Sequence, residues 1–166
     1  MRKLILVAAV ALTASLALTA CNKQAADGAG QQTAQQAPKP TDPNDTKAWN
    51  AYLGDIVQKN MQDMTASQPY AYLVKAPTDQ DAKEQNERQL KNVQETVARG
   101  VLPGNMLVFA GPDSATTADL VVAAFADASA GAFKGVIVLV IGDAADKGRV
   151  EEALKPTGAT FRFVAM

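Results

Sequence analysis

Six consecutive apolar residues, Val136 to Ile141, restrict the possible folds of this chain more than any other segment. Five of these six residues are Val or Ile, whose branched side chains favour β-strands. The run shows no polar alternation, which is typical of a strand buried on both faces of a parallel sheet. Met106 to Ala110 has the same apolar character. We therefore expect these two segments to be central strands.

Two further segments, Tyr70–Val74 and Phe161–Val164, predict two more strands. Apolar residues recur at helical spacing between the four strand segments, which indicates intervening helices. This alternation predicts an α/β domain with a four-stranded, mainly parallel sheet, flanking helices and right-handed crossovers. The two less apolar segments would form the sheet edges, where Arg162 marks a wetter position.

The first helix is predicted to begin with Asp42 as its N-cap and Pro43 in its first turn. Its inward face would carry apolar residues at helical spacing: Trp49, Tyr52, Leu53, Ile56, Val57, Met61 and Met64. Trp49 is expected to anchor the core, with an interface contact as the alternative. Tyr70 and Tyr72 would share one face of an edge strand, where packing is favoured over sugar stacking.

The starts and ends of the other helices are predicted from capping residues. Thr78 would be the N-cap of the second helix in a capping box. The third helix would follow the turn formed by residues 111–114 and end at Gly131. A short helix would begin at Asp143 or Asp146 after the most apolar strand.

The composition excludes several kinds of chemistry, because the chain has no histidine and one cysteine. Without histidine there is no Ser–His or Cys–His catalysis and no imidazole metal ligand. A single cysteine excludes an intramolecular disulfide and a thiolate metal cluster. The formal net charge of −1 argues against a protein that holds nucleic acid electrostatically.

The single cysteine, Cys21, follows a segment with the features of a secretory signal. Arg2 and Lys3 provide the positive start, and the 15 residues of Leu4–Leu18 are apolar apart from two hydroxyl residues. As a helix this stretch would be too short to cross a hydrocarbon core of about 30 Å. Leu18-Thr19-Ala20-Cys21 resembles the lipobox of bacterial lipoproteins. The alternatives are an ordinary secretory signal with an incidental cysteine, or an N-terminal membrane helix.

The resemblance implies that residues 1–20 are removed and that Cys21 carries a thioether-linked diacylglycerol and an acylated amine. Two or more acyl chains anchor a protein stably. Asn22, in place of Asp, resembles the lipoproteins that Gram-negative bacteria send to the outer membrane, with the domain facing the periplasm. Loss of residues 1–20 removes two basic and no acidic side chains, so acyl chains rather than surface charge would provide the anchor.

A polar tether separates the predicted anchor from the predicted domain. The 24 residues from Asn22 to Asp45 contain no Leu, Ile, Val, Met or aromatic residue. Such a segment cannot bury enough apolar area to offset its conformational entropy. We therefore expect residues 21–45 to form a lipidated, flexible tether and residues 46–166 to form one globular domain.

Polar residues follow the two central strands at their carboxyl ends, where open parallel sheets bind ligands. The candidate ligand-binding residues are Asp113, Ser114, Thr117, Asp143, Asp146 and Lys147. A phosphate or nucleotide would lie at the helix N-termini, and Asp113 and Asp143 would hold Mg²⁺ with waters. Helix capping is the alternative use of the same residue types. No dinucleotide-binding motif, P-loop or nucleophile elbow accompanies them.

Taken together, these features favour a lipid-anchored envelope lipoprotein whose domain is a protein-interaction or assembly module rather than an enzyme. Its partners would be the membrane, through Cys21, and another envelope protein, and no cofactor is predicted. The alternative is a small-ligand module that binds phosphate, a nucleotide or a metal with the loops after the second and third strands. A metal-dependent enzyme using Asp113 and Asp143 is the third hypothesis.

Overall fold

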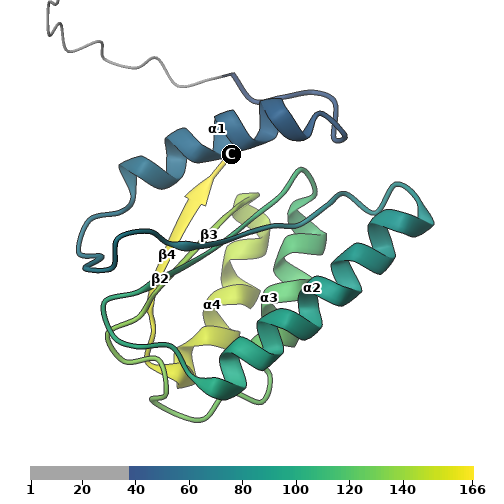
Figure 1. The fold of residues 1–166 in the computed structure, drawn as a ribbon. Coiled ribbons are helices and arrows are strands. Elements are labelled where there is room, and N and C mark those ends of the chain that lie inside the picture. Colours follow the sequence, from purple (N-terminus) through teal and green to yellow (C-terminus); the bar gives the residue numbers. More distant parts are fainter. Residues whose placement is uncertain (1–37) are drawn as a thin grey trace, which may run out of the picture. The chain divides into compact units, whose positions relative to one another are not determined.

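The computed structural model describes residues 38–166 (Figure 1). The predictions for the signal segment, Cys21, Asn22 and most of the tether lie outside the described residues. The elements in chain order are α1 (Thr46–Lys59), β1 (Tyr70–Leu73), α2 (Gln80–Arg99), β2 (Met106–Ala110), α3 (Ser114–Phe125), β3 (Ile137–Gly142), η1 (Ala144–Asp146), α4 (Lys147–Leu154), η2 (Lys155–Thr157) and β4 (Thr160–Ala165). No helix in this part of the chain is long and apolar enough to cross a membrane.

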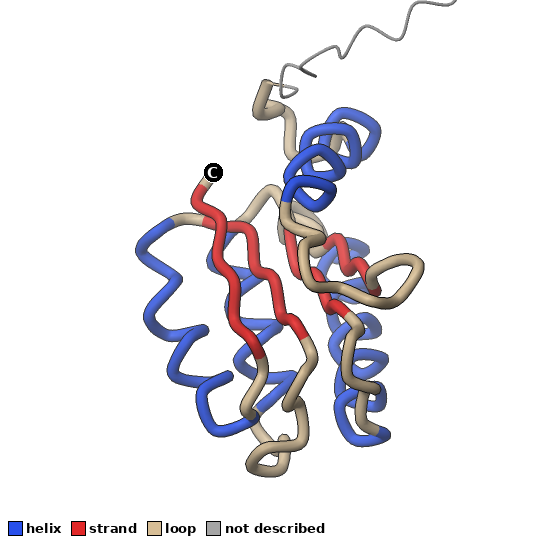
Figure 2. The backbone as a smooth tube through the Cα atoms, turned by 90° about the vertical axis from the view of Figure 1, so that its left-hand side faces the viewer, coloured by secondary structure: helices blue, strands red, loops and turns tan. Residues whose placement is uncertain are grey.

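The predicted α/β fold is confirmed. Within the described residues, the sheet has the strand order β1-β2-β3-β4, and every neighbouring pair is parallel. β2 and β3 are buried along their whole length, whereas β1 and β4 form the partly exposed edges (Figure 2). The two apolar runs are therefore the central strands, as expected.

The strand order explains how the helices are distributed. Each strand lies beside the preceding one in the same direction, so right-handed crossovers place every connecting helix on the same face of the sheet. Figure 1 shows α2, α3 and α4 together on one face and α1 alone on the other. Because one helix covers less area than three, the α1 face is the less completely covered face.

The face under α2, α3 and α4 holds the larger core, which contains a series of packed aromatic rings. Phe109 on β2 lies edge-on to Phe125 at 6.1 Å between ring centroids, and Phe125 lies 5.2 Å from Phe133. Tyr72 on β1 stacks on Phe109 at 5.1 Å. Tyr72 is partly buried and packs against the core, as predicted, while Tyr70 is 50% exposed.

The opposite face packs against α1 alone. Four residues at helical spacing are buried there: Trp49, Tyr52, Leu53 and Ile56. They contact the alternate strand residues that point toward α1, including Met106 and Val108 of β2 and Leu139 of β3. Trp49 is 3% exposed and its ring lies 5.9 Å from that of Tyr52, so its predicted role as a core anchor is confirmed.

The start of α1 differs from the prediction by three residues. Asp45, not Asp42, is the N-cap, and its carboxylate accepts a 3.0 Å hydrogen bond from the amide of Ala48. The main-chain carbonyl of Asp42 instead accepts from the indole Nε1 of Trp49 at 2.9 Å. The sequence offers two acidic residues in the same turn, and the buried indole fixes which of them begins the helix.

The end of α1 also differs, because the helix stops at Lys59 and does not include Met61 and Met64. Asn60 closes the helix, and Arg162 of β4 donates a 2.7 Å hydrogen bond to its carbonyl oxygen. Met64 still packs against the α1 core from the loop. A contact from the distant C-terminal strand thus helps to end a helix whose apolar spacing continues.

Two other helix ends were predicted wrongly. Asp79, not Thr78, is the N-cap of α2, and its carboxylate accepts a 2.7 Å hydrogen bond from the amide of Ala82. Both residue types cap helices, so local sequence does not separate them. α3 ends at Phe125 rather than at Gly131. Gly131, at φ 74°, lies in the loop beyond that helix.

Candidate functional site

Ser114 and Asp146 meet at the carboxyl end of the central strands. The Ser114 hydroxyl donates to Asp146 Oδ2 at 2.5 Å and accepts from the main-chain N–H of Asp143 at 2.7 Å. Ser114 begins α3 and is 6% exposed, so this hydroxyl links the loop after β2 to the loop after β3. We call the six predicted ligand-binding residues the polar edge: Asp113, Ser114, Thr117, Asp143, Asp146 and Lys147.

Arg149 of α4 extends this contact into a network. Its guanidinium pairs with Asp146 at 2.8 Å, also pairs with Asp119, and donates to the carbonyl of Ala115 at 2.9 Å. The hydrogen bond from Ser114 is the main reason that the pKa of Asp146 lies below its ordinary value, and Arg149 acts in the same direction against burial. The carboxylates of Asp119 and Asp146 raise the pKa of Arg149.

Asp113 and Thr117 serve the first turn of α3. The Asp113 carboxylate accepts a 2.7 Å hydrogen bond from the amide of Thr116, and the buried Thr117 hydroxyl donates to the Asp113 carbonyl at 2.9 Å. Asp143 and Lys147 are exposed. Asp143 occupies the N-cap position of η1, as the capping alternative predicts, but its carboxylate accepts no capping hydrogen bond.

The structure leaves little room for a ligand between these loops. A Cβ atom added at Gly142 would lie 2.5 Å from Ser114 Oγ, and one added at Gly111 would lie 2.2 Å from the carbonyl oxygen of Val74. These two glycines allow the protein's own loops to approach each other. Among residues 38–166, no group of three or more Asp, Glu, Cys or His side chains is arranged to hold a metal ion.

The chemistry available at the polar edge is limited. The Ser114 hydroxyl uses its one proton on Asp146 and one of its two acceptor lone pairs on the amide of Asp143, so it has no proton left to donate to a ligand. A carboxylate with a lowered pKa is a weak general base. In the sheet formed by residues 38–166, the strands lie in sequence order, without the reversal of strand order at which open α/β sheets form their ligand crevice. The network therefore joins α3 to α4, and ligand binding at this edge stays a prediction.

A second feature, which the sequence did not reveal, is a groove of about 330 Å³ between α1 and β1. Its volume is at the lower end of the range for small-ligand pockets, roughly 300–1,000 Å³. The helix side and the following loop contribute Asn50, Leu53, Gly54, Val57, Gln58 and Met61. The strand side contributes Pro69, Ala71, Tyr72, Leu73, Val108 and Ala110. We call this the α1–β1 groove, and none of its lining residues carries a charge.

Gly54 lies in the wall of the α1–β1 groove and in the interior of α1. Apart from its chain neighbours and the adjacent backbone of α1, no heavy atom lies within 4 Å of a Cβ atom built at this position. Glycine inside a helix lowers stability by roughly 0.5–1 kcal/mol relative to alanine. Neither packing nor a positive φ accounts for Gly54, in contrast to Gly111 and Gly142. An isolated glycine within a helical pattern was the available sequence signal for the groove.

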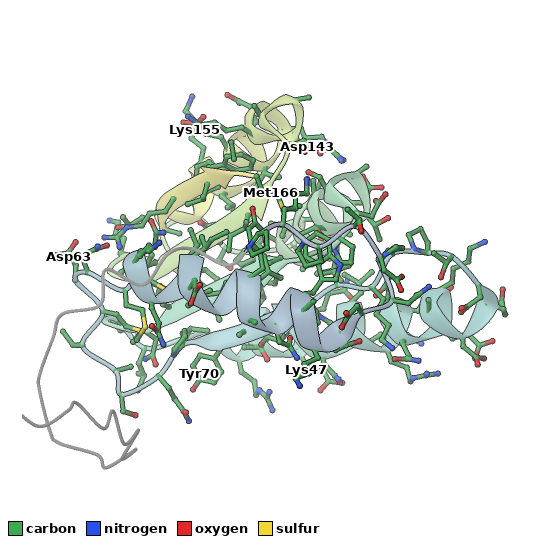
Figure 3. The ribbon with its side chains drawn as sticks, turned by 90° about the horizontal axis from the view of Figure 1, so that it is seen from above. Lys47, Asp63, Tyr70, Asp143, Lys155 and Met166 are labelled. Carbon is green, nitrogen blue, oxygen red and sulfur yellow. The ribbon has the colours of Figure 1, made fainter. Side chains whose placement is uncertain are left out.

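The α1–β1 groove and the polar edge are separate. Seen from above (Figure 3), Tyr70, at the start of β1, lies on one side of α1, and Asp143 lies on the other side. Comparisons of the chain with models of protein families, with curated proteins and with solved structures found no significant match.

Proposed function

We propose that this chain is a lipid-anchored module of the cell envelope that binds another envelope protein and catalyses no reaction. The observation that carries the proposal is the α1–β1 groove, an uncharged apolar surface left open where a single helix covers one sheet face. Concave sites lined mostly by apolar side chains with a few polar groups are the usual form of binding pockets. We assign the predicted interaction surface to this groove.

Two further considerations support the proposal. The lipobox-like Leu18-Thr19-Ala20-Cys21 would place the domain at a membrane, and Asn22 favours the periplasmic side of an outer membrane. The hydroxyl of Ser114 and the carboxylate of Asp146 already satisfy each other at the polar edge, which argues against a catalytic role there.

The anchor and the binding surface are tested separately. We expect Cys21→Ser to prevent lipidation, which mass spectrometry of the processed N-terminus would show directly. Full membrane retention of a signal-cleaved Cys21→Ser protein would contradict the anchor.

The binding surface is tested by photo-crosslinking in cells that produce the full chain. A photoreactive amino acid at position 58, which is exposed at the rim of the groove, should give a discrete crosslinked protein, whereas the same amino acid at the exposed Gly148 of α4 should not. The captured protein, once purified, should bind the unmodified chain and lose affinity for Gly54→Leu. A captured protein that binds both chains equally would contradict the groove as the binding surface.

A further inference from the structure

We infer that the partner segment is an extended, uncharged peptide that adds as a fifth strand to the outer edge of β1 and inserts alternate apolar side chains into the α1–β1 groove. This inference rests on the proposed function and specifies the class of partner. It combines two independent features of the structure, the unpaired main chain of an edge strand and the uncharged groove beside it.

The main chain of β1 offers hydrogen-bonding groups on its outer side. The amide of Val74 donates to the carbonyl of Ala110 in β2 at 2.8 Å. Because successive residues of a strand point their N–H and C=O groups in opposite directions, Tyr72 also faces β2, while Ala71 and Leu73 face outward. Within residues 38–166, no main-chain hydrogen bond is formed by these outward groups. They match the pairing needs of an added strand.

The same residues connect the strand edge to the groove. Ala71 and Leu73 both line the α1–β1 groove, and Leu73 packs against the core under α1. In an added strand, every second side chain would therefore lie beside Ala71 and Leu73, below α1. The remaining side chains of the added strand would point to the opposite face of the sheet, where Tyr70 is 50% exposed to solvent. The expected segment alternates apolar and polar residues and has no charge in its apolar row.

Gly54 favours an occupant that approaches the backbone of α1. The open space above this residue is available to a side chain of the added strand, and a larger residue at position 54 would occupy it. An acyl chain would also fit an uncharged groove, but it has no main-chain groups to pair with Ala71 and Leu73. Strand addition uses both features, and we therefore assign the groove to a peptide.

The experiment uses the mature full-length protein in lipid nanodiscs and a displayed library of linear eight-residue peptides as the probe. We expect enrichment of peptides with alternating apolar residues. Binding of the synthesised peptide should weaken about tenfold or more, equivalent to about 1.4 kcal/mol, in Gly54→Leu. The matched control is Gly148→Leu, since Gly148 is also helical and an added Cβ atom there would likewise meet nothing within 4 Å beyond its own stretch of helix. That control should leave affinity unchanged.

Ala71→Pro tests the main-chain pairing, because it removes an outward N–H that the sheet does not use, and edge strands tolerate proline. It should weaken binding while thermal melting shows a folded domain. If this variant does not fold, N-methylation of alternate peptide amides tests the same hydrogen bonds on the unmodified protein. Of the two possible sets of alternate amides, methylation of the set that faces β1 should abolish binding.

Three outcomes would overturn the inference. Enriched peptides with apolar residues three and four apart, insensitive to Ala71→Pro and to N-methylation, would show a helix in the groove and leave the proposed function intact. A second such outcome is that palmitate binds wild type, displaces every peptide and does not bind Gly54→Leu. This result would assign the groove to an acyl chain and contradict the proposed function. Absence of any enriched peptide would reject strand addition, while the crosslinking result would still decide the proposed function.

Discussion

Arg162, in the C-terminal strand, donates a 2.7 Å hydrogen bond to the carbonyl oxygen of Asn60, the residue that closes α1. The same guanidinium donates to the carbonyl of Gln62 and pairs with Asp63, each at 2.7 Å. Its side chain is 21% exposed, so these bonds are partly shielded from water. Arg162, which we expected at a solvent-exposed sheet edge, therefore holds the end of α1 to the sheet. The adjacent residue Met61 lines one end of the α1–β1 groove.

We expect Arg162→Met to lower the free energy of unfolding by roughly 1–3 kcal/mol, because hydrogen bonds to charged groups contribute more than neutral ones. Methionine keeps much of the apolar stem and removes the donors. The control is Asp63→Asn, which should change stability by less than about 0.5 kcal/mol, because Asp63 is 82% exposed and exposed ion pairs contribute little. Urea unfolding measures both. Equal losses of stability in the two variants would show that the ion pair with Asp63, and not the hydrogen bonds to the carbonyl oxygens, provides the stabilisation.

Val138→Asp tests the assignment of β3 as a central strand. Val138 is fully buried and packs in the core beneath α2, α3 and α4. A carboxylate at this position would have no partner, and burial of an unpaired charge is among the most destabilising substitutions known. We expect the variant to be unfolded by far-ultraviolet circular dichroism at neutral pH, while Val138→Ala stays folded. A folded, cooperative Val138→Asp protein would contradict the buried central position.

The sequence predicts best what local pattern determines. The apolar runs at Met106–Ala110 and Val136–Ile141 indicated buried parallel strands, because no polar residue interrupts them. Contacts between distant segments had no such signal. Nothing near Met61 shows that Arg162, about a hundred residues later, helps to end α1. The α1–β1 groove depends in the same way on where α1 lies over the sheet, and the sequence offered only Gly54 as an indication.

Capping residues show a different limit. Asp42 and Asp45, like Thr78 and Asp79, are pairs of nearby residues that are both of a type favoured as helix N-caps. Tertiary contacts make the choice, as the indole of Trp49 does by taking the carbonyl of Asp42. The sequence predicts which residues form the polar edge, but it does not predict the hydrogen bond between Ser114 and Asp146. That contact follows from the strand order, which local patterns do not specify.

The link between Ser114 and Asp146 should make stability depend on pH in the acid range. The folded-state pKa of Asp146 lies below its ordinary value of 3.8, so its contribution is fully present above that value and is lost as pH falls through the folded-state pKa. We expect Asp146→Asn to be less stable than wild type at pH 6, with a smaller difference at pH 2.5. Urea unfolding at both values tests this. A difference that grows toward low pH would contradict the assignment.

Asp113 and Asp143 distinguish capping from ligand binding at the polar edge. Asp113→Ala removes the acceptor for the amide of Thr116 and should lower stability by about 1 kcal/mol. Asp143→Ala should be nearly neutral, because its carboxylate accepts no capping hydrogen bond. The double variant should equal the sum of the single variants, since each carboxylate acts alone.

A shared cation site at the polar edge predicts the opposite pattern. Two carboxylates held close together without a cation repel each other, so either single variant would be more stable than wild type in the absence of metal. Saturating Mg²⁺ would then raise the melting temperature of wild type but not that of the variants, because a ligand that binds the folded state stabilises it by mass action. We expect no effect of Mg²⁺ or of inorganic phosphate on wild type. If either ion stabilises wild type but not the variants, the hypothesis of a non-catalytic interaction module is wrong, and the protein binds a ligand or depends on a metal.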